Sequence, residues 1–211
     1  MYKIEDIINK VHCADCLEFM KNIPDKCIDL VLTDPPYGIN FDYEGYEDTP
    51  ENLQGLIDNF MPEFERICRG NIIITSGITN IGRYPKPYWI LSWIYRGGQN
   101  RGKWGFNCWQ PILCYGKDPY LVNLKGARAD IIEDNTPPIN YGHTCSKPET
   151  FWTKLLERVS VKDTDIVLDP FLGSGTTAVV CRKSGRKFIG IEQSETYCEI
   201  ARKRLSQEQL F

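Results

Sequence analysis

The sequence lacks a long hydrophobic run, and this absence argues against a membrane-spanning protein. No stretch approaches the roughly 18 apolar residues that a membrane helix requires. The first ten residues, MYKIEDIINK, contain acidic side chains and no apolar core, so we expect no secretory signal peptide. A cytoplasmic location is the resulting expectation.

Internal repeats, low-complexity tracts and a paired metal-ligand motif are also missing. Nine cysteines are present, but only His12, Cys13 and Cys16 cluster, and no second pair follows at short spacing. We therefore predict no metal site and reduced thiols. The length of 211 residues, with 42% hydrophobic and 25% charged residues, predicts a single domain over residues 1–211.

Charge is unevenly distributed along the chain. Residues 80–128 carry eight basic and one acidic side chain, a net charge of +7, within a chain whose net charge is −3. The same segment contains ten aromatic residues. Cationic side chains attract phosphates and aromatic rings stack on bases, so this composition favours nucleic-acid contact over a merely solvated face.

Strand-like runs alternate with helical patterns, which predicts an α/β fold with a mostly parallel twisted sheet and helices on both faces. We expect strands at 27–33, 71–75, 88–95, 111–116, 165–170 and 187–192. Helices are expected after Pro50, with Thr49 as its cap and Gly70 as its end, after Pro148, over 176–184 and from Ser194. Residues 38–50 are interpreted as a loop.

The stretch LVLTDPPYGIN ends a buried strand with an acid, two prolines and a tyrosine. Prolines stop both a strand ladder and a helix, so Asp34 and Tyr37 are held in a stiff turn. Taken alone, Asp34-Pro35-Pro36-Tyr37 could be such a turn or a device that holds a flat polar substrate.

A second unit, DIVLDPFLGSGTTAVVCRKSGRKFIGIE, reads as strand, glycine loop, helix, strand and acid. Gly173, Gly175 and Ala178 fit the G-x-G-x-x-G/A spacing, and Glu192 can accept hydrogen bonds from ribose hydroxyls. This predicts an adenosine-containing cofactor. An acid and an aromatic ring just before the glycines, Asp169 and Phe171, favour S-adenosylmethionine over NAD, without excluding NAD.

Together the two units resemble the DNA amino-methyltransferases, which methylate the N6 amine of adenine or the N4 amine of cytosine. The order, catalytic motif first and cofactor motif last, resembles the circularly permuted β class. Three further stretches are similar to segments of that family: HCADCLEFM, WQPILCYGK and HTCSKPETFWTKLL. The matches extend from about residue 11 to 205. The resemblance implies a Rossmann-like methyltransferase fold.

The resemblance also implies site residues. Asp34, Pro35, Pro36 and Tyr37 would form the catalytic site. The cofactor would be bound by Asp15, Lys147, Asp169, Phe171, Gly173, Gly175, Thr176 and Glu192. Within it, Lys147 would approach the methionine carboxylate and Asp169 the amino group. The expected DNA contacts are Arg83, Lys86, Arg96, Arg101, Lys103 and His143.

The chain departs from the family in its target-recognition region, since residues 117–142 leave only 26 positions for it. The basic aromatic region, 80–142, would then be a minimal DNA-contacting insert. Sequence readout would be slight, borrowed from a partner or built by dimerisation. A homodimer and a cognate restriction endonuclease are open expectations, and the resemblance implies a bacterial or phage-infected cell.

An exocyclic amine is a weak nucleophile because its lone pair is delocalised into the ring. The Asp34 carboxylate and the Pro35 carbonyl could accept its two hydrogens, while Tyr37 stacks on a base flipped out of the duplex. A cytosine-C5 enzyme is rejected, since it needs a cysteine that usually follows proline and no Pro-Cys pair occurs. Family members acting on cytosine N4 more often have serine at position 34, which favours adenine. An NAD-dependent oxidoreductase and a non-catalytic nucleic-acid-binding module are the alternatives from other classes.

Overall fold

The computed structural model describes residues 1–96, 101–102, 104–137, 139 and 147–207. Eight strands form one sheet in the order β1-β12-β11-β2-β5-β9-β6-β10. Their bounds are β1 (Lys10–Cys13), β2 (Ile28–Thr33), β5 (Cys68–Thr75), β6 (Trp89–Ile94), β9 (Trp109–Tyr115), β10 (Ile131–Glu133), β11 (Ile166–Asp169) and β12 (Lys187–Glu192). All neighbouring pairs are parallel except those that β9 makes with β5 and β6. The predicted α/β class is therefore confirmed.

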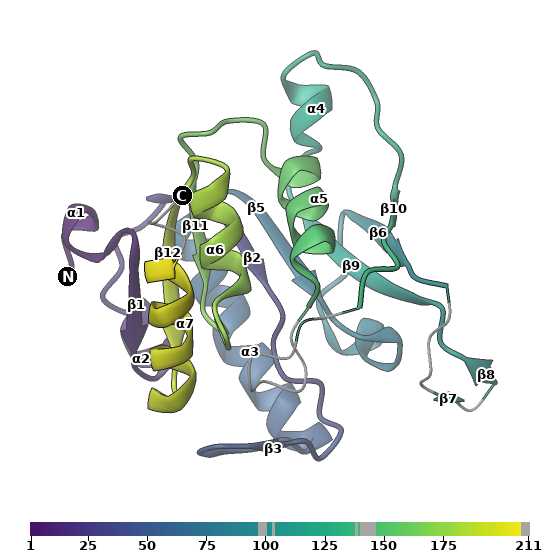
Figure 1. Ribbon diagram of the computed structural model, residues 1–211, viewed down its shortest axis with the longest axis horizontal. Helices are drawn as coiled ribbons and strands as arrows, with labels where there is room; N and C mark the ends of the chain where they lie inside the picture. The colour runs from purple at the N-terminus through teal and green to yellow at the C-terminus, as the bar shows by residue number, and fades with distance from the viewer. Residues whose placement is uncertain (97–100, 103, 138, 140–146, 208–211) are drawn as a thin grey trace.

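Helices cover both faces of this sheet (Figure 1). On one face lie α5 (Glu149–Val159), α6 (Thr176–Lys183) and α7 (Glu195–Gln207), and on the other lies α3 (Pro50–Ile67). Shorter elements are α1 (Ile4–Ile7), α2 (Cys16–Met20), η1 (Ile78–Arg83) and α4 (Pro119–Val122). No helix in the described ranges has the length and apolar character needed to cross a membrane.

The two faces follow from side-chain alternation along the strands. In β2, Leu30 and Leu32 pack into the core under α5 and α6, whereas Val31 packs into the core under α3. Because successive side chains point to opposite faces, a continuous apolar run is required of a strand that is covered on both sides. The central strands are therefore fully buried, and their ends carry the polar residues.

The predicted helix caps are confirmed. The Thr49 side chain accepts a hydrogen bond from the Asn52 amide at 3.1 Å, with Pro50 in the first turn. The end of that helix was predicted wrongly, because α3 ends at Ile67 and Gly70 lies inside β5. A Cβ at Gly70 would lie 1.9 Å from the Asp29 carbonyl oxygen. Gly70 therefore permits close approach of two strands and does not end a helix.

Two short hairpins interrupt segments for which no strand was expected. Residues 38–50, interpreted as a loop, contain the antiparallel pair β3 (Asp42–Tyr43) and β4 (Tyr46–Glu47). The link between β6 and β9 contains β7 (Arg101–Gly102) and β8 (Gly105–Phe106). Each of these four strands is only two residues long, too short to give an alternating pattern in the sequence.

Candidate functional site

The candidate site lies where the carboxyl ends of β2 and β11 meet. These neighbouring strands lead in opposite directions across the sheet, since β11 continues through α6 to β12 and β2 continues through α3 to β5. Such a reversal of strand order is the usual ligand-binding crevice of an open α/β sheet. The two predicted motifs begin at these two strand ends, with Asp34 and Asp169, which are 135 residues apart in the sequence.

Asp169 ends β11 and is buried, with 3% of its surface exposed. Its carboxylate accepts hydrogen bonds from the hydroxyls of Thr33 (2.7 Å) and Thr177 (2.5 Å) and from the Phe171 amide (3.1 Å). Burial raises the pKa of Asp169 to about 6. The side chain predicted to meet the cofactor's amino group is thus bonded to its own chain, although it also lines the cavity described below.

Asp34 follows β2 and has three donors around it, Tyr37 from its own turn and Thr75 and Lys147 from distant segments. Its Oδ2 lies 2.6 Å from the Lys147 ammonium, and its Oδ1 accepts a hydrogen bond of 2.6 Å from the Tyr37 hydroxyl. The Thr75 hydroxyl, at the end of β5, also donates to Oδ1. Lys147, predicted to reach the methionine carboxylate, is therefore paired with Asp34, the acid predicted to be catalytic.

Two side-chain amides that were not predicted as site residues hold Tyr37 in position. Gln110 in β9 donates to the Tyr37 hydroxyl, and the Asn80 side chain donates to its backbone carbonyl at 2.8 Å. Burial and the charge of Asp34 raise the pKa of Tyr37 well above its ordinary value, so the phenol keeps its proton at neutral pH. Thr75 and Asn80 lie outside the quoted motifs, whereas Gln110 lies inside WQPILCYGK, a stretch to which no site role was assigned. Only Thr75 could have been suggested by its position, since it ends the predicted strand at 71–75.

The turn after Tyr37 depends on Asp48, another buried carboxylate, with 2% exposure. It accepts hydrogen bonds from the backbone amides of Gly38 (2.6 Å), Ile39 (3.0 Å) and Phe41 (3.1 Å). Beyond it the β3–β4 hairpin is attached to the end of β12, because the Ser194 hydroxyl donates to Glu44 at 2.6 Å. The turn predicted to be catalytic and the segment predicted to bind the cofactor are thereby joined.

The glycine loop between β11 and α6 has the predicted geometry. The Glu192 carboxylate accepts hydrogen bonds from the amides of Gly173 (2.7 Å) and Ser194 (2.9 Å). Gly175 has a φ of +89°, and a Cβ there would lie 2.7 Å from the Ala201 Cβ. A side chain at Gly175 would meet both backbone strain and a clash with α7.

A cavity of about 180 Å³ connects these parts. Nine of the twelve predicted catalytic and cofactor residues line it: Asp15, Asp34, Pro36, Lys147, Asp169, Phe171, Gly173, Thr176 and Glu192. Tyr43, Glu44, Tyr46 and Tyr197 also line it and were not predicted. Among the described residues that line the cavity, five are carboxylates and a single one, Lys147, is a cation. Asp15 also caps α2, accepting the Glu18 amide at 2.9 Å.

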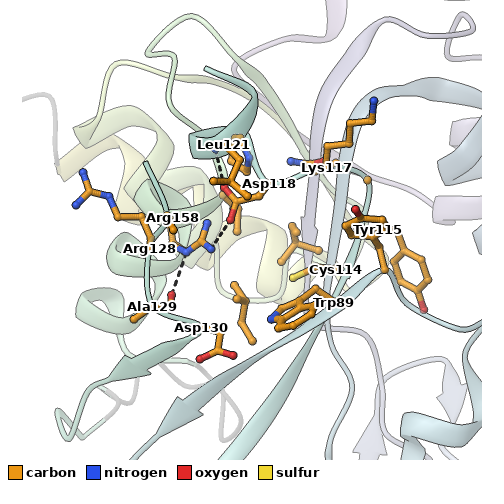
Figure 2. A pocket seen from close by; sticks show the side chains of 18 residues that line it. Trp89, Cys114, Tyr115, Lys117, Asp118, Leu121, Arg128, Ala129, Asp130 and Arg158 are labelled. Atoms are coloured by element: carbon orange, nitrogen blue, oxygen red, sulfur yellow. Dashed lines mark hydrogen bonds and ion pairs between the residues drawn. The ribbon is translucent and has the colours of Figure 1, made fainter. Parts of the chain in front are cut away.

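A larger cavity of about 730 Å³ lies at the other end of the sheet (Figure 2). Trp89, Cys114 and Tyr115 line it, and Arg158 reaches across to Asp118 at 2.6 Å. None of the predicted site residues whose side chains the structure describes lines it. The start of β6 and the end of β9 line this cavity, whereas the two motifs follow the carboxyl ends of β2 and β11, at the opposite ends of the strands.

The basic aromatic region is divided between these two ends. Tyr84 and Trp93 are buried core residues, and Tyr88 and Trp89 face the larger cavity. Trp104, Phe106 and Trp109 are exposed at the end that carries Gln110, and Trp104 is fully exposed. The composition of residues 80–128 favoured nucleic-acid contact, and the sheet separates the exposed aromatic residues of this region into two groups.

The predicted DNA-contacting side chains are only partly described. Arg83 donates to the Pro50 carbonyl at 3.1 Å, Lys86 is exposed, and Arg96 is exposed with Glu133 at 4.0 Å. The backbone of Arg101 lies in β7. Lys103 and His143 lie outside the described residues. Within the described ranges, no three His, Cys, Asp or Glu side chains are grouped to hold a metal ion.

Comparisons with known proteins agree with the fold. The model of the N6/N4 DNA methylase family matches residues 87–203, more than half of the chain. The chain therefore belongs to the DNA amino-methyltransferase family.

Relatives of known name are type II methyltransferases. M.HinfI of Haemophilus influenzae is 26% identical over 96% of this chain and 69% of its own length. M.HpaI of Haemophilus parainfluenzae is 28% identical over 93% of this chain and 74% of its own length. M.BamHI of Bacillus amyloliquefaciens is 28% identical over 94% of this chain and 57% of its own length.

Two solved structures show the shared fold. The complex of M1.HpyAVI with SAM has a TM-score of 0.70 at 23% identity and covers 93% of this chain and 98% of its own. The cytosine-N4-specific PvuII DNA methyltransferase has a TM-score of 0.71 at 16% identity and covers 92% of this chain and 85% of its own. The predicted Rossmann-like methyltransferase fold is confirmed.

Proposed function

We propose that this protein transfers a methyl group from S-adenosylmethionine to the exocyclic N6 amine of an adenine flipped out of DNA. The observation that carries the proposal is the single cavity that has Asp34 and Pro36 at one end and Gly173 and Glu192 at the other. One cavity can therefore hold a cofactor and present it to the amine site.

Charge favours S-adenosylmethionine over NAD. The cavity has five carboxylates against one ammonium among its described lining residues. S-adenosylmethionine brings a sulfonium and an ammonium together with one carboxylate, which matches this set. The pyrophosphate of NAD would bring negative charge among the carboxylates, where like charges repel. Several structures of this fold were solved with the same cofactor bound, among them M1.HpyAVI.

Different residues of the cavity would contact different parts of the cofactor. Glu192, at the end of β12, would accept hydrogen bonds from the ribose hydroxyls with the lone pairs that Gly173 and Ser194 leave open. Phe171 would lie on the adenine ring, and Asp15 would lie near it. Asp169 and Lys147 would face the amino-acid end. Bound there, S-adenosylmethionine supplies an electrophilic methyl group.

At the amine site, the protein supplies acceptors and a ring. The Asp34 carboxylate accepts one N–H of the amine and the Pro35 carbonyl accepts the other, which favours a pyramidal nitrogen and stabilises its developing positive charge. Tyr37 stacks on the flipped base, which returns about 1–3 kcal/mol of the unstacking cost. Thr75, Asn80 and Gln110 hold Asp34 and Tyr37 in position.

Adenine is favoured because an acid and not serine stands at position 34, as the family resemblance implies. Cytosine N4 is the alternative, and the fold does not separate the two, since the PvuII enzyme shares it. The type II relatives support DNA as the substrate, a bacterial cytoplasmic setting and a cognate endonuclease as further parts of the proposal. A homodimer would enlarge the short recognition surface.

The test is methylation of DNA in cells that express the protein, followed by methylation-sensitive long-read sequencing and nucleoside analysis. We expect N6-methyladenine in a defined sequence context and none with Asp34→Ala. Asp163→Ala, an exposed turn acid, is the matched control and should methylate normally. Detection of N4-methylcytosine instead would make cytosine, and not adenine, the target base. DNA retention without methyl transfer in the wild type would indicate a binding module instead.

A further inference from the structure

The amine site of this protein is already occupied by its own side chains. Both oxygens of Asp34 have partners, since Oδ2 is paired with the Lys147 ammonium at 2.6 Å and Oδ1 accepts from Tyr37 and Thr75. An incoming amine must take one of these places. Lys147 holds the place that faces the cavity.

Lys147 also covers the second group assigned to the base. Its Nζ lies 3.3 Å from the Tyr37 hydroxyl and 5.2 Å from the centroid of the Tyr37 ring. An ammonium at that distance over an aromatic ring is held by the cation–π attraction. A base that stacks on the Tyr37 ring and donates to Asp34 Oδ2 therefore competes with Lys147 for both of these groups.

The ion pair is sheltered from water, because the side chains of Lys147 and Asp34 are 14% and 21% exposed. Removing one member of such a pair without replacement leaves a charge without a partner, which is costly. Lys147 therefore leaves Asp34 readily only if another anion meets it. The cofactor proposed above carries one carboxylate, and Lys147 is the single cation among the described residues of its cavity.

We propose that Lys147 closes the amine site until a cofactor carboxylate draws it away, so that cofactor binding and entry of the target base favour each other. The inference rests on the proposed function and deepens it, since it gives Lys147 two successive partners. By linkage, the factor by which cofactor tightens base binding equals the factor by which the base tightens cofactor binding. Lys147 is thus a positioning residue whose removal uncouples the two ligands.

The experiment compares two cofactor analogues on one DNA probe. The probe is a duplex containing the methylated sequence found in cells, with 2-aminopurine at the target position, whose fluorescence rises when it leaves the stack. S-adenosylhomocysteine carries the carboxylate, and 5′-methylthioadenosine lacks the whole amino-acid end. We expect the first to tighten the flipped complex of the wild type about 10-fold or more, a coupling in the usual allosteric range, and the second to leave it unchanged.

Lys147→Met should bind the probe in the flipped state without any analogue, and its coupling factor should fall to about one. Lys154→Met is the matched control, because it removes an ammonium from the nearby helix α5 that pairs with Asp134 outside the cavity. Lys147→Gln provides a second substitution, and circular dichroism checks that each variant folds.

Two outcomes would overturn the inference. The first is a loss of affinity for S-adenosylhomocysteine in Lys147→Met with the coupling still at the wild-type value, which would make Lys147 a cofactor ligand alone. A wild type that methylates DNA but shows no coupling would also refute it. In both cases methylation by the wild type and its loss in Asp34→Ala leave the proposed function standing.

Discussion

At the scale of single residues, two aspartates on neighbouring strands have different surroundings. Asp34 faces an ammonium and two hydroxyls at the edge of a cavity, whereas Asp169 is bonded to two threonines and an amide inside the protein. Each stands at a strand end before a proline, so the sequence could point to both. Their different partners depend on residues far along the chain.

Thr75 donates to the carboxylate that we propose to be catalytic, so its hydroxyl should matter for turnover. Thr75→Val keeps the shape and removes the donor to Asp34 Oδ1. A hydrogen bond to a charged group contributes about 1.5–3 kcal/mol, so kcat should fall about 10-fold or more. Binding of S-adenosylhomocysteine, measured by calorimetry, should be unchanged. Thr164→Val, at an exposed turn, should have normal kcat; a normal kcat in Thr75→Val would remove Thr75 from the site.

Asp169 should make stability depend on pH. Because burial raises its pKa from 3.8 to about 6 in the folded state, the folded protein binds this proton more tightly than the unfolded chain does. That contribution is fully present below pH 3.8 and is lost as pH rises through about 6.

Asp169→Asn removes this titration while its amide oxygen and nitrogen can still meet the Phe171 amide and the Thr177 hydroxyl. Between about pH 5 and about pH 7.5, the free energy of unfolding of the wild type should therefore fall relative to the variant by on the order of 1 kcal/mol. Urea unfolding at both pH values measures the difference. Asp163→Asn is the exposed control, and parallel profiles for wild type and Asp169→Asn would contradict the assignment.

At the scale of elements, sequence patterns identified what is long and regular. The strand at 187–192 and the cap at Thr49 were predicted from periodicity and turn chemistry, and both are present. The end of α3 and the β3–β4 hairpin were not, because Gly70 serves a close strand contact and Asp48 shapes the turn through backbone amides. Thr75 and Gln110 were missed for a related reason, since only the sheet order brings them to Tyr37.

The β7–β8 hairpin carries the exposed Trp104 and Phe106, and it lies at the same ends of the strands as Asp34. Trp104→Ala should weaken DNA binding about 10-fold, in line with the roughly 1–3 kcal/mol of base stacking on an aromatic ring. Trp89→Ala is a matched control, because Trp89 is also exposed and belongs to the same basic region but faces the cavity at the opposite end. Fluorescence anisotropy at one fixed salt concentration compares them. Equal losses for both variants would show that aromatic position does not matter.

At the scale of the whole molecule, the cofactor cavity joins the two ends of the sequence. Asp15 and Asp34 come from the first strands of the chain and Phe171 and Glu192 from the last, and β1 pairs with β12 beside them. The parallel sheet produces this meeting, since the carboxyl ends of parallel strands share one edge. The residues that line the rest of the cavity, such as Tyr43 and Tyr197, required the folded chain.

A ligand that contacts both ends of the chain should stabilise the entire fold. At about 100 times its Kd, S-adenosylhomocysteine should add about 2.7 kcal/mol to the free energy of unfolding, which is about 5–10 °C in Tm for a domain of this size. NAD at the same concentration should give no shift, because its phosphates would meet the carboxylates of the cavity. Glu192→Gln should reduce the shift, whereas Glu195→Gln, on the exposed first turn of α7, should keep it. Scanning calorimetry measures all four, and a shift with NAD equal to that with S-adenosylhomocysteine would return the oxidoreductase to consideration.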